Sequence, residues 1–287
     1  MRHLHELHIH QFRGLRGLKL HDLGQINLFI GGNNSGKTSV LEAVATFARP
    51  LDPHEWLNTA RRRELMLSSV PVIDSLEWFF PHDIAGEPGD FFSGETHISS
   101  QGIFPVREVR AFFNEVHGTP PATREDAFTD TVRWGAELTL TARVMPESDG
   151  TSTTDTVSKT FLLWEDEPLT QRQPTVCPML PVNTITPHAH RVERIQIQQL
   201  SETAFLDVKT TAVGLLQRFD SDVQDLQVWS RNGQRPNLYI KHKRSGLAPL
   251  SSFGDGMRRA LLIATIIPLC RDGILLIDEL ETAIHTQ

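Results

Sequence analysis

Residues 31–38 of the chain read Gly31-Gly32-Asn33-Asn34-Ser35-Gly36-Lys37-Thr38, which fits the pattern G-x-x-x-x-G-K-[ST] without a mismatch. The stretch before it, Ile26-Asn27-Leu28-Phe29-Ile30, predicts a short buried strand, and residues 39–45 predict the first turns of a helix. Glycines let backbone N–H groups close around phosphates, and a helix N-terminus adds a positive partial charge. The context argues against a glycine turn without a ligand, so we expect a nucleoside triphosphate to bind here.

Two side chains of this loop carry the expected chemistry. Lys37 would neutralise the β- and γ-phosphates, and the hydroxyl of Thr38 would be a ligand of Mg²⁺. The residues expected to surround the phosphates are Gly31, Asn33, Asn34, Ser35, Gly36, Lys37, Thr38 and Ser39.

The composition is that of an ordinary soluble protein. The chain has 287 residues, of which 39% are hydrophobic and 22% charged. We find no signal-peptide pattern and no apolar run long enough to span a bilayer. The two cysteines, Cys177 and Cys270, are far apart and suit no metal-ligand spacing, so reduced thiols and a cytoplasmic location are expected.

The net charge of −7 gives no global attraction for nucleic acid. Two short basic clusters remain, at residues 61–63 (RRR) and 241–244 (KHKR). Each is either a solvated face or an edge that contacts DNA, and the sequence leaves both interpretations open.

The rest of the chain divides into three regions. Leu4 to Leu20 alternates apolar and polar residues around a glycine turn and predicts an antiparallel hairpin. Its four histidines (His3, His5, His8 and His10) are interpreted as polar side chains of a half-exposed strand rather than as metal ligands. Residues 49–191 are irregular, with strands predicted at 132–144 and 157–164, and residues 191–219 are predicted to be mainly helical. Further strands are predicted at 223–229 and 238–241.

The C-terminal part adds two motifs in a fixed order. Residues 251–259 (SSFGDGMRR) place a Ser-x-Gly-x-Gly turn at the start of a predicted helix, where free N–H groups can face an anion or where the turn is only a helix N-cap. Residues 273–279 (GILLIDE) predict a buried parallel strand that ends in two carboxylates. Asp278 would hold Mg²⁺, and Glu279 would polarise the water that attacks the γ-phosphate.

Three motifs in this order resemble those of the ABC-type ATPase superfamily, which includes SMC heads, RecF-like proteins and OLD-family proteins. The string GGNNSGKTSVLEA resembles the Walker A motif, SSFGDGMRRAL the signature motif, and GILLIDELETAIH the Walker B motif with the following D-loop. The resemblance covers residues 1–48 and about 235–287 well and the middle poorly. It implies that ATP and Mg²⁺ are the ligands.

The resemblance also implies roles for further residues. In that superfamily the signature motif of one subunit completes the γ-phosphate site of another, so Ser252, Gly254 and Gly256 would act in trans on a dimer. Arg13 resembles an arginine that can reach the nucleotide in SMC-type heads, or it is a plain surface arginine. His285 follows Glu279 as in OLD-like heads, where it would sense the γ-phosphate, or it is structural. The signature departs from the transporter-type SGGQ, and no Q-loop glutamine can be placed.

The expected fold is α/β: an ABC-type P-loop NTPase head with an N-terminal antiparallel β hairpin and an inserted α+β lobe. We assign residues 1–48 and 192–287 to the ATPase core and residues 49–191 to the lobe, which would supply partner or ligand specificity. Because more core elements follow the D-loop in that superfamily, the core is expected to be incomplete at Gln287.

The expected function is an ATP-hydrolysing switch of the OLD-like branch that forms at least a dimer around ATP and controls a protein effector, as in anti-phage defence. Two alternatives stay open. One is a RecF-like repair ATPase that binds DNA, which the net charge does not favour. The other is an ATP-dependent scaffold with little turnover. No membrane partner is expected.

Overall fold

A computed structural model describes residues 2–63, 71–82, 91–118, 133–145, 154–165, 177–191, 205–230 and 236–282. The fold is mixed α/β, as expected, and includes a large antiparallel sheet. The chain forms two compact units, residues 1–180 and 181–287, which we call the N-terminal unit and the C-terminal unit.

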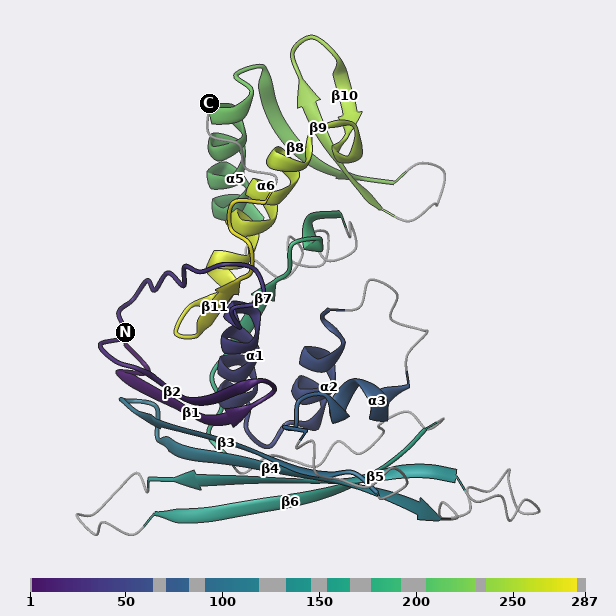
Figure 1. The fold of residues 1–287 in the computed structure, drawn as a ribbon. Helices are drawn as coiled ribbons and strands as arrows, with labels where there is room; N and C mark the ends of the chain where they lie inside the picture. Colours follow the sequence, from purple (N-terminus) through teal and green to yellow (C-terminus); the bar gives the residue numbers. More distant parts are fainter. Residues whose placement is uncertain are drawn as a thin grey trace. The chain divides into compact units, whose positions relative to one another are not determined.

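The N-terminal unit is built on a six-stranded sheet with the order β2-β1-β3-β4-β5-β6, in which every neighbouring pair is antiparallel (Figure 1). Its strands are β1 (Glu6–Phe12), β2 (Leu15–Leu20), β3 (Ser93–Gln101), β4 (Val106–Gly118), β5 (Arg133–Val144) and β6 (Asp155–Trp164). The predicted hairpin at residues 4–20 and the predicted strands at 132–144 and 157–164 are therefore confirmed.

Three helices cover one face of this sheet: α1 (Lys37–Ala48), α2 (Pro53–Arg61) and α3 (Val72–Glu77) (Figure 1). Alternate strand residues point toward them and are buried, because successive side chains of a strand lie on opposite faces. The largest fully buried side chains of the unit include Phe12, Phe47, Trp56, Phe79, Phe80, Phe113 and Phe161. This core fixes the start of α1, where the phosphate loop ends.

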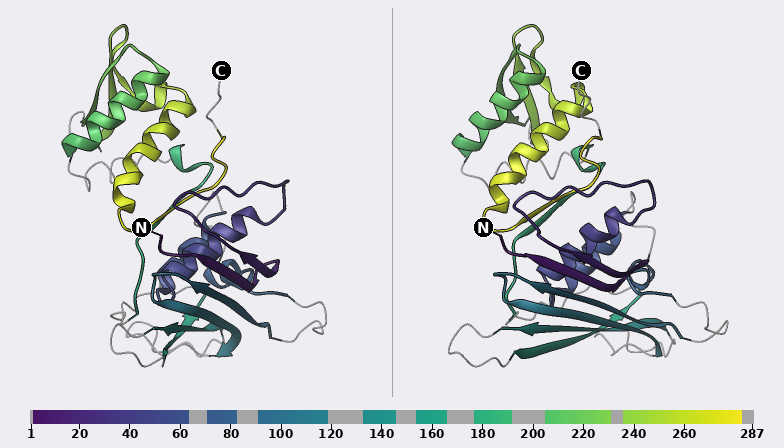
Figure 2. Two further views of the ribbon diagram at one scale, coloured as in Figure 1. Left: turned by 90° about the vertical axis from the view of Figure 1, so that its left-hand side faces the viewer. Right: turned by 60° about the vertical axis from the view of Figure 1, so that its left-hand side comes forward.

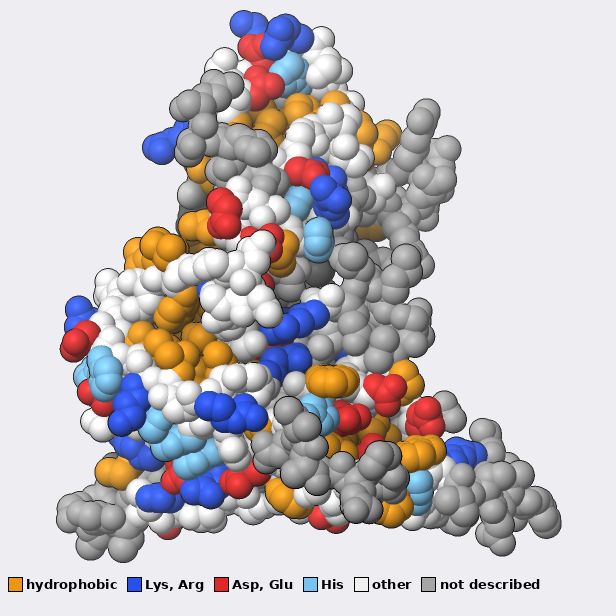
Figure 3. All heavy atoms as spheres, in the orientation of Figure 1, with side chains coloured by type: hydrophobic (Ala, Val, Ile, Leu, Met, Phe, Trp, Pro, Cys, Tyr) orange, Lys and Arg blue, Asp and Glu red, His pale blue; other side chains and the backbone are white. Residues whose placement is uncertain are grey.

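The other face of the sheet is mainly polar and carries a histidine stack. The rings of His8 and His10 lie 3.6 Å apart between centroids, and those of His10 and His97 lie 3.8 Å apart and nearly parallel. Figure 3 shows histidine side chains gathered among charged ones on this unit. His10 shares a hydrogen bond with Ser99, and His97 lies 2.9 Å from a carboxylate oxygen of Glu108. These partners agree with the interpretation of polar side chains on a half-exposed strand.

The strand predicted at residues 26–30 is wrong for this structure. No described strand pairs with this segment, and the side chains of Ile26, Leu28 and Ile30 are 92%, 71% and 86% exposed. A strand needs a neighbour for its backbone N–H and C=O groups, and the alternating pattern alone does not supply one.

Where the structure describes it, the C-terminal unit contains two small sheets and two long helices. Strands β7 (Val182–Ile185) and β11 (Ile274–Ile277) pair in parallel, and the order β10-β9-β8 joins β8 (Val223–Trp229), β9 (Asn237–His242) and β10 (Gly246–Pro249). Helices α5 (Phe205–Phe219) and α6 (Asp255–Ile266) lie side by side against the three-stranded sheet (Figure 2). Short 3₁₀ helices span Ala189–Arg191, Leu250–Ser252 and Ile267–Cys270.

The predicted elements of this unit are largely confirmed, including the parallel strand before Asp278. The helical prediction for residues 191–219 holds over α5, while residues 192–204 lie outside the described part of the chain. The boundaries assigned to the core and the inserted lobe stay a prediction. The compact units divide elsewhere, because β1 of the predicted core and β3 of the predicted lobe pair in one sheet.

Within the described ranges, none of the helices has both the length and the apolar character needed to cross a bilayer. Both cysteines are free thiols. Burial raises the pKa of Cys177 to about 11.

Candidate functional site

The phosphate loop has the backbone of an anion cradle. Gly36 has φ +89° and Asn34 has φ +62°, so both lie in the left-handed region that bends the chain into the helix. A Cβ atom on Gly31 would lie 2.7 Å from Ser35 Oγ, and one on Gly36 would lie 2.8 Å from a methyl group of Leu15. Gly36 therefore needs glycine for its conformation, whereas the side chains of Ser35 and Leu15 can turn away from a Cβ atom at either position.

The helix that follows presents its first amides without a competing side chain. Gly36 is the N-cap of α1 and makes no side-chain cap, and the first turn contains no acidic residue. Because the first N–H groups of a helix have no partner within the helix, they suit a phosphate group. The loop thus fits the group that the motif predicts.

Lys37 lies inside the loop. Its Nζ donates to the carbonyl oxygens of Gly31 at 2.7 Å and Gly32 at 2.8 Å. An ammonium group held this way is directed across the cradle rather than toward bulk solvent. Thr38 follows at the second helical position and is half-buried.

Behind the loop, α1 carries a buried carboxylate between two arginines. Glu42 is 4% exposed and accepts two hydrogen bonds of 2.7 Å from Arg63, while Arg13 Nε lies 2.7 Å from its Oε2. Arg63 also donates to Ser39 Oγ at 3.1 Å. This group of Glu42, Arg13 and Arg63 is called the arginine–glutamate cluster below, and it reaches the first turn of α1 through Ser39.

Sequence reasoning missed this cluster, although a glutamate within the apolar stretch VLEAVA is a visible signal. Arg13, expected either to reach the nucleotide or to lie on the surface, is 12% exposed and also lies 4.3 Å over the ring of Phe79. Burial lowers the pKa of Arg13, although Glu42 opposes that shift. Arg62 pairs with Glu55 in the same way, so residues 62 and 63 of the first basic cluster form ion pairs within the unit.

The signature-like turn lies in the C-terminal unit. Ser252 ends a 3₁₀ helix and donates from Oγ to the carbonyl of Pro249 at 2.6 Å. Gly254 is the N-cap of α6 and makes no side-chain cap, and Gly256 is the second residue of that helix. Ser252 and Gly254 are exposed. The turn is therefore a helix N-terminus whose backbone faces solvent.

Asp255 places a carboxylate in the first turn of α6. It accepts hydrogen bonds from Arg191 at 2.7 and 3.1 Å and from Arg258 at 3.3 Å, and His190 lies 3.5 Å away. The hydrogen bonds from Arg191 hold the pKa of Asp255 below its usual range. The sequence motif contained Asp255 without indicating that Arg191 would neutralise it.

The acidic pair follows β11 directly. The N–H of Asp278 donates to the carbonyl of Ile185 at 2.9 Å and so extends the parallel pairing with β7. Glu279 has φ +48°, is exposed, and accepts a 2.8 Å hydrogen bond from Thr282 through Oε2. Both carboxylates thus lie at the carboxyl edge of parallel strands, where ligands of α/β proteins bind.

The predicted residues therefore belong to two units. Lys37 and Thr38 lie in the N-terminal unit, and Ser252, Asp278 and Glu279 lie in the C-terminal unit. His285 lies outside the described residues.

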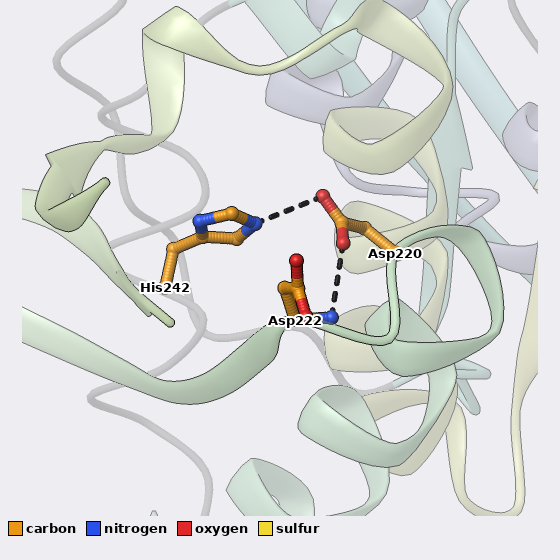
Figure 4. Close-up of side chains that lie close together, drawn as sticks. All are labelled: Asp220, Asp222 and His242. Carbon is orange, nitrogen blue, oxygen red and sulfur yellow. Dashed lines mark hydrogen bonds and ion pairs between the residues drawn. The ribbon is translucent and has the colours of Figure 1, made fainter. Parts of the chain in front are cut away.

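A separate cluster of Asp220, Asp222 and His242 has metal-ligand residue types within 4.8 Å of one another (Figure 4). The hydrogen bonds of His242 assign it another role. Its Nδ1 faces the N–H groups of Arg244 and Ser245 and therefore accepts, which leaves the proton on Nε2, 3.2 Å from Asp220. Because both ring nitrogens are engaged, His242 ties the β9–β10 turn to the turn before β8.

Comparison with known proteins gives partial matches. A family model described as "AAA domain, putative AbiEii toxin, Type IV TA system" matches residues 186–287. The uncharacterized protein MJECL10 of Methanocaldococcus jannaschii is 58% identical over 41 residues, which are 14% of this chain and 19% of that protein.

Two DNA replication and repair proteins RecF also match. The protein of Acinetobacter baumannii is 48% identical over 46 residues, 16% of this chain and 13% of the relative. The protein of Limosilactobacillus reuteri is 35% identical over 72 residues, 23% of this chain and 19% of the relative. The aligned stretch thus spans a fifth or less of each of these relatives. Together with the backbone of the phosphate loop, these matches support placing the chain in the P-loop ATPase superfamily.

Proposed function

We propose that the protein is an ATP-binding and ATP-hydrolysing switch that dimerises around Mg²⁺-ATP and controls a protein effector. One observation supports nucleotide binding. Lys37 lies inside a loop that has left-handed residues at Asn34 and Gly36, and this loop leads into a helix N-terminus without a side-chain cap. Few other ligands would use both the amides and the ammonium group as a triphosphate does.

Each residue has one task in this proposal. Lys37 exchanges its two carbonyl contacts for phosphate oxygens, and the α1 amides hold the same phosphates. Thr38 and Asp278 would hold Mg²⁺, which supplies charge neutralisation on the phosphates. Glu279 accepts the proton of the attacking water. Among the residues that the structure describes, its exposed side chain accepts a hydrogen bond from Thr282 at Oε2, which leaves Oε1 for this role.

The proposed dimer rests on the signature-like turn. Ser252, Gly254 and Gly256 on one subunit would close over the γ-phosphate bound by the other. Support comes from the exposed, uncapped start of α6 and from the neutralised Asp255, because an unpaired carboxylate there would repel a phosphate.

The test is the solution mass of Glu279→Gln with and without Mg²⁺-ATP. An amide cannot act as a base, so ATP stays bound and the dimer accumulates. Glu281→Gln, another exposed carboxylate two residues away, is the matched control and should turn over ATP as wild type does. Normal hydrolysis by Glu279→Gln would remove the assignment.

Control of an effector in anti-phage defence is the biological setting that we propose. The matching family model, whose description names a toxin of a toxin–antitoxin system, supports a regulatory rather than a metabolic role. Deleting the gene from a cell that the protein protects should raise the phage yield. Expressing the Lys37→Ala variant in that cell should fail to restore protection.

A second candidate is a RecF-like ATPase that binds DNA, which the RecF matches favour. Lys241 and Lys243 are exposed, whereas Arg244 is paired with Asp222. This candidate predicts ATPase activity that DNA stimulates and that salt weakens, because phosphate contacts release counterions. An ATP-dependent scaffold with little turnover is the third candidate, and a dimer that forms with ATP but never hydrolyses it would favour it.

A further inference from the structure

Arg259 is a buried cation with an unusual set of partners. The residue lies on α6 and is 0% exposed. None of the ion pairs found among the described residues includes it, and its Nε has no hydrogen-bond partner in that part of the chain. A buried charge is costly unless it is paired or hydrogen-bonded, so the contacts that it makes need an explanation.

The guanidinium group binds four backbone carbonyls. Nη1 donates to Thr186 at 3.2 Å and Pro187 at 3.0 Å, and Nη2 donates to Asp278 and Glu279, both at 2.7 Å. These carbonyls follow β7 and β11, the two parallel strands, so Arg259 caps the carboxyl edge of that sheet.

The hydrogen bonds from Arg259 fix the turn that contains Asp278 and Glu279. Glu279 has φ +48°, a conformation that is uncommon for residues other than glycine and that persists only where neighbours fix it. The two 2.7 Å hydrogen bonds from Nη2 fix the peptide groups on either side of its Cα atom. Burial lowers the pKa of Arg259, and the carboxylates of Glu279 and Asp278 oppose that shift.

The same helix begins at the signature-like turn. Gly254 is the N-cap of α6, and Arg259 follows within its next two turns. Because a helix moves as a rigid element over this length, a displacement of its N-terminus also displaces the guanidinium group.

We propose that Arg259 is a positioning residue that aligns Asp278 and Glu279 and couples their alignment to the signature-like turn. The inference rests on the proposed ATPase function and adds a regulatory connection within it. Arginine suits this task because its planar fork binds two pairs of carbonyls at fixed angles, which the single ammonium group of lysine does not reproduce.

The test compares Arg259→Lys with wild type in steady-state ATPase kinetics. We expect kcat to fall at least tenfold while KM changes less than about threefold, because misalignment affects the chemical step rather than binding. Hydrogen exchange at residues 278–282 should become faster in the same variant.

A matched control separates positioning from simple loss of stability. His242→Ala removes another buried, hydrogen-bonded side chain of the same unit, whose hydrogen bonds join the β9–β10 turn to the turn before β8. It should lower the melting temperature at unchanged kcat. If Arg259→Lys loses no more kcat than His242→Ala does, the inference is overturned.

Failure of the proposed function would give a different result from failure of this inference alone. A wild-type chain without ATPase activity, or a Glu279→Gln variant with full activity, overturns that function and this inference together. Normal kcat in Arg259→Lys beside an inactive Glu279→Gln overturns the inference alone.

Discussion

The buried carboxylate behind the phosphate loop gives the sharpest stability prediction. Glu42→Gln keeps the size of the side chain but removes its charge and turns an NH₂ donor toward two guanidinium donors. Glu42 is 4% exposed and has three contacts of 2.7 Å with Arg13 and Arg63, so the variant leaves both cations without their carboxylate.

The loss of unfolding free energy depends on how well each arginine can regain contact with water. Removing one partner of a buried ion pair costs about 3–5 kcal/mol. Arg13 is 12% exposed and stays buried, whereas Arg63 is 44% exposed and can turn toward water. We therefore expect the lower end of the range, about 3 kcal/mol of unfolding free energy. For a unit of 180 residues this corresponds to a fall in melting temperature of about 6–12 °C.

The assay is calorimetric unfolding of the whole chain. Tryptophan fluorescence assigns the transition of the N-terminal unit, because four of the five tryptophans lie in residues 1–180. The control is Glu95→Gln. Glu95 is 37% exposed and lies 3.2 Å from Arg110, and exposed pairs of this kind contribute about 0–1 kcal/mol. A Glu42→Gln protein that melts within a degree or two of wild type would refute the reasoning about the cluster.

Three further predictions concern other parts of the chain. His242→Ala should lower the melting temperature of the C-terminal unit, while a chelator added to wild type should leave it unchanged, because the imidazole anchors a turn and binds no metal. Burial lowers the pKa of the stacked histidines His8, His10 and His97, so the folded state favours neutral rings; above the unfolded pKa of about 6.5 their contribution is full, and it is lost as the pH falls. The double variant His10→Gln/His97→Gln should therefore lose less melting temperature than wild type between about pH 7.5 and about pH 5.5, and an equal loss would contradict this. Ser252→Arg should bind nucleotide as a monomer yet neither dimerise nor turn over ATP, and normal turnover would exclude the site in trans.

The sequence was most informative where a pattern has a single local cause. The glycines at 31 and 36 and Lys37 follow from backbone conformation and charge within one loop, so the motif predicted their arrangement. The apolar run before Asp278 likewise predicted a parallel strand, and β11 pairs with β7 in parallel.

Predictions failed or were missing where a partner far along the chain decides the outcome. The pattern of residues 26–30 suggests a strand, but pairing depends on a neighbour that the pattern does not name. The partners of Glu42 lie 29 residues before it and 21 after it, and Arg259 contacts carbonyls about 73 and 20 residues away. Neither separation follows a local period, so only the fold reveals these contacts.

The central claim is that residues 31–38 bind Mg²⁺-ATP, and calorimetric titration of the wild-type chain beside Lys37→Ala tests it most directly. The account predicts saturable binding to wild type that weakens at least tenfold in Lys37→Ala, with both proteins folded by calorimetry. Equal binding by the two proteins, or none by wild type, would contradict it.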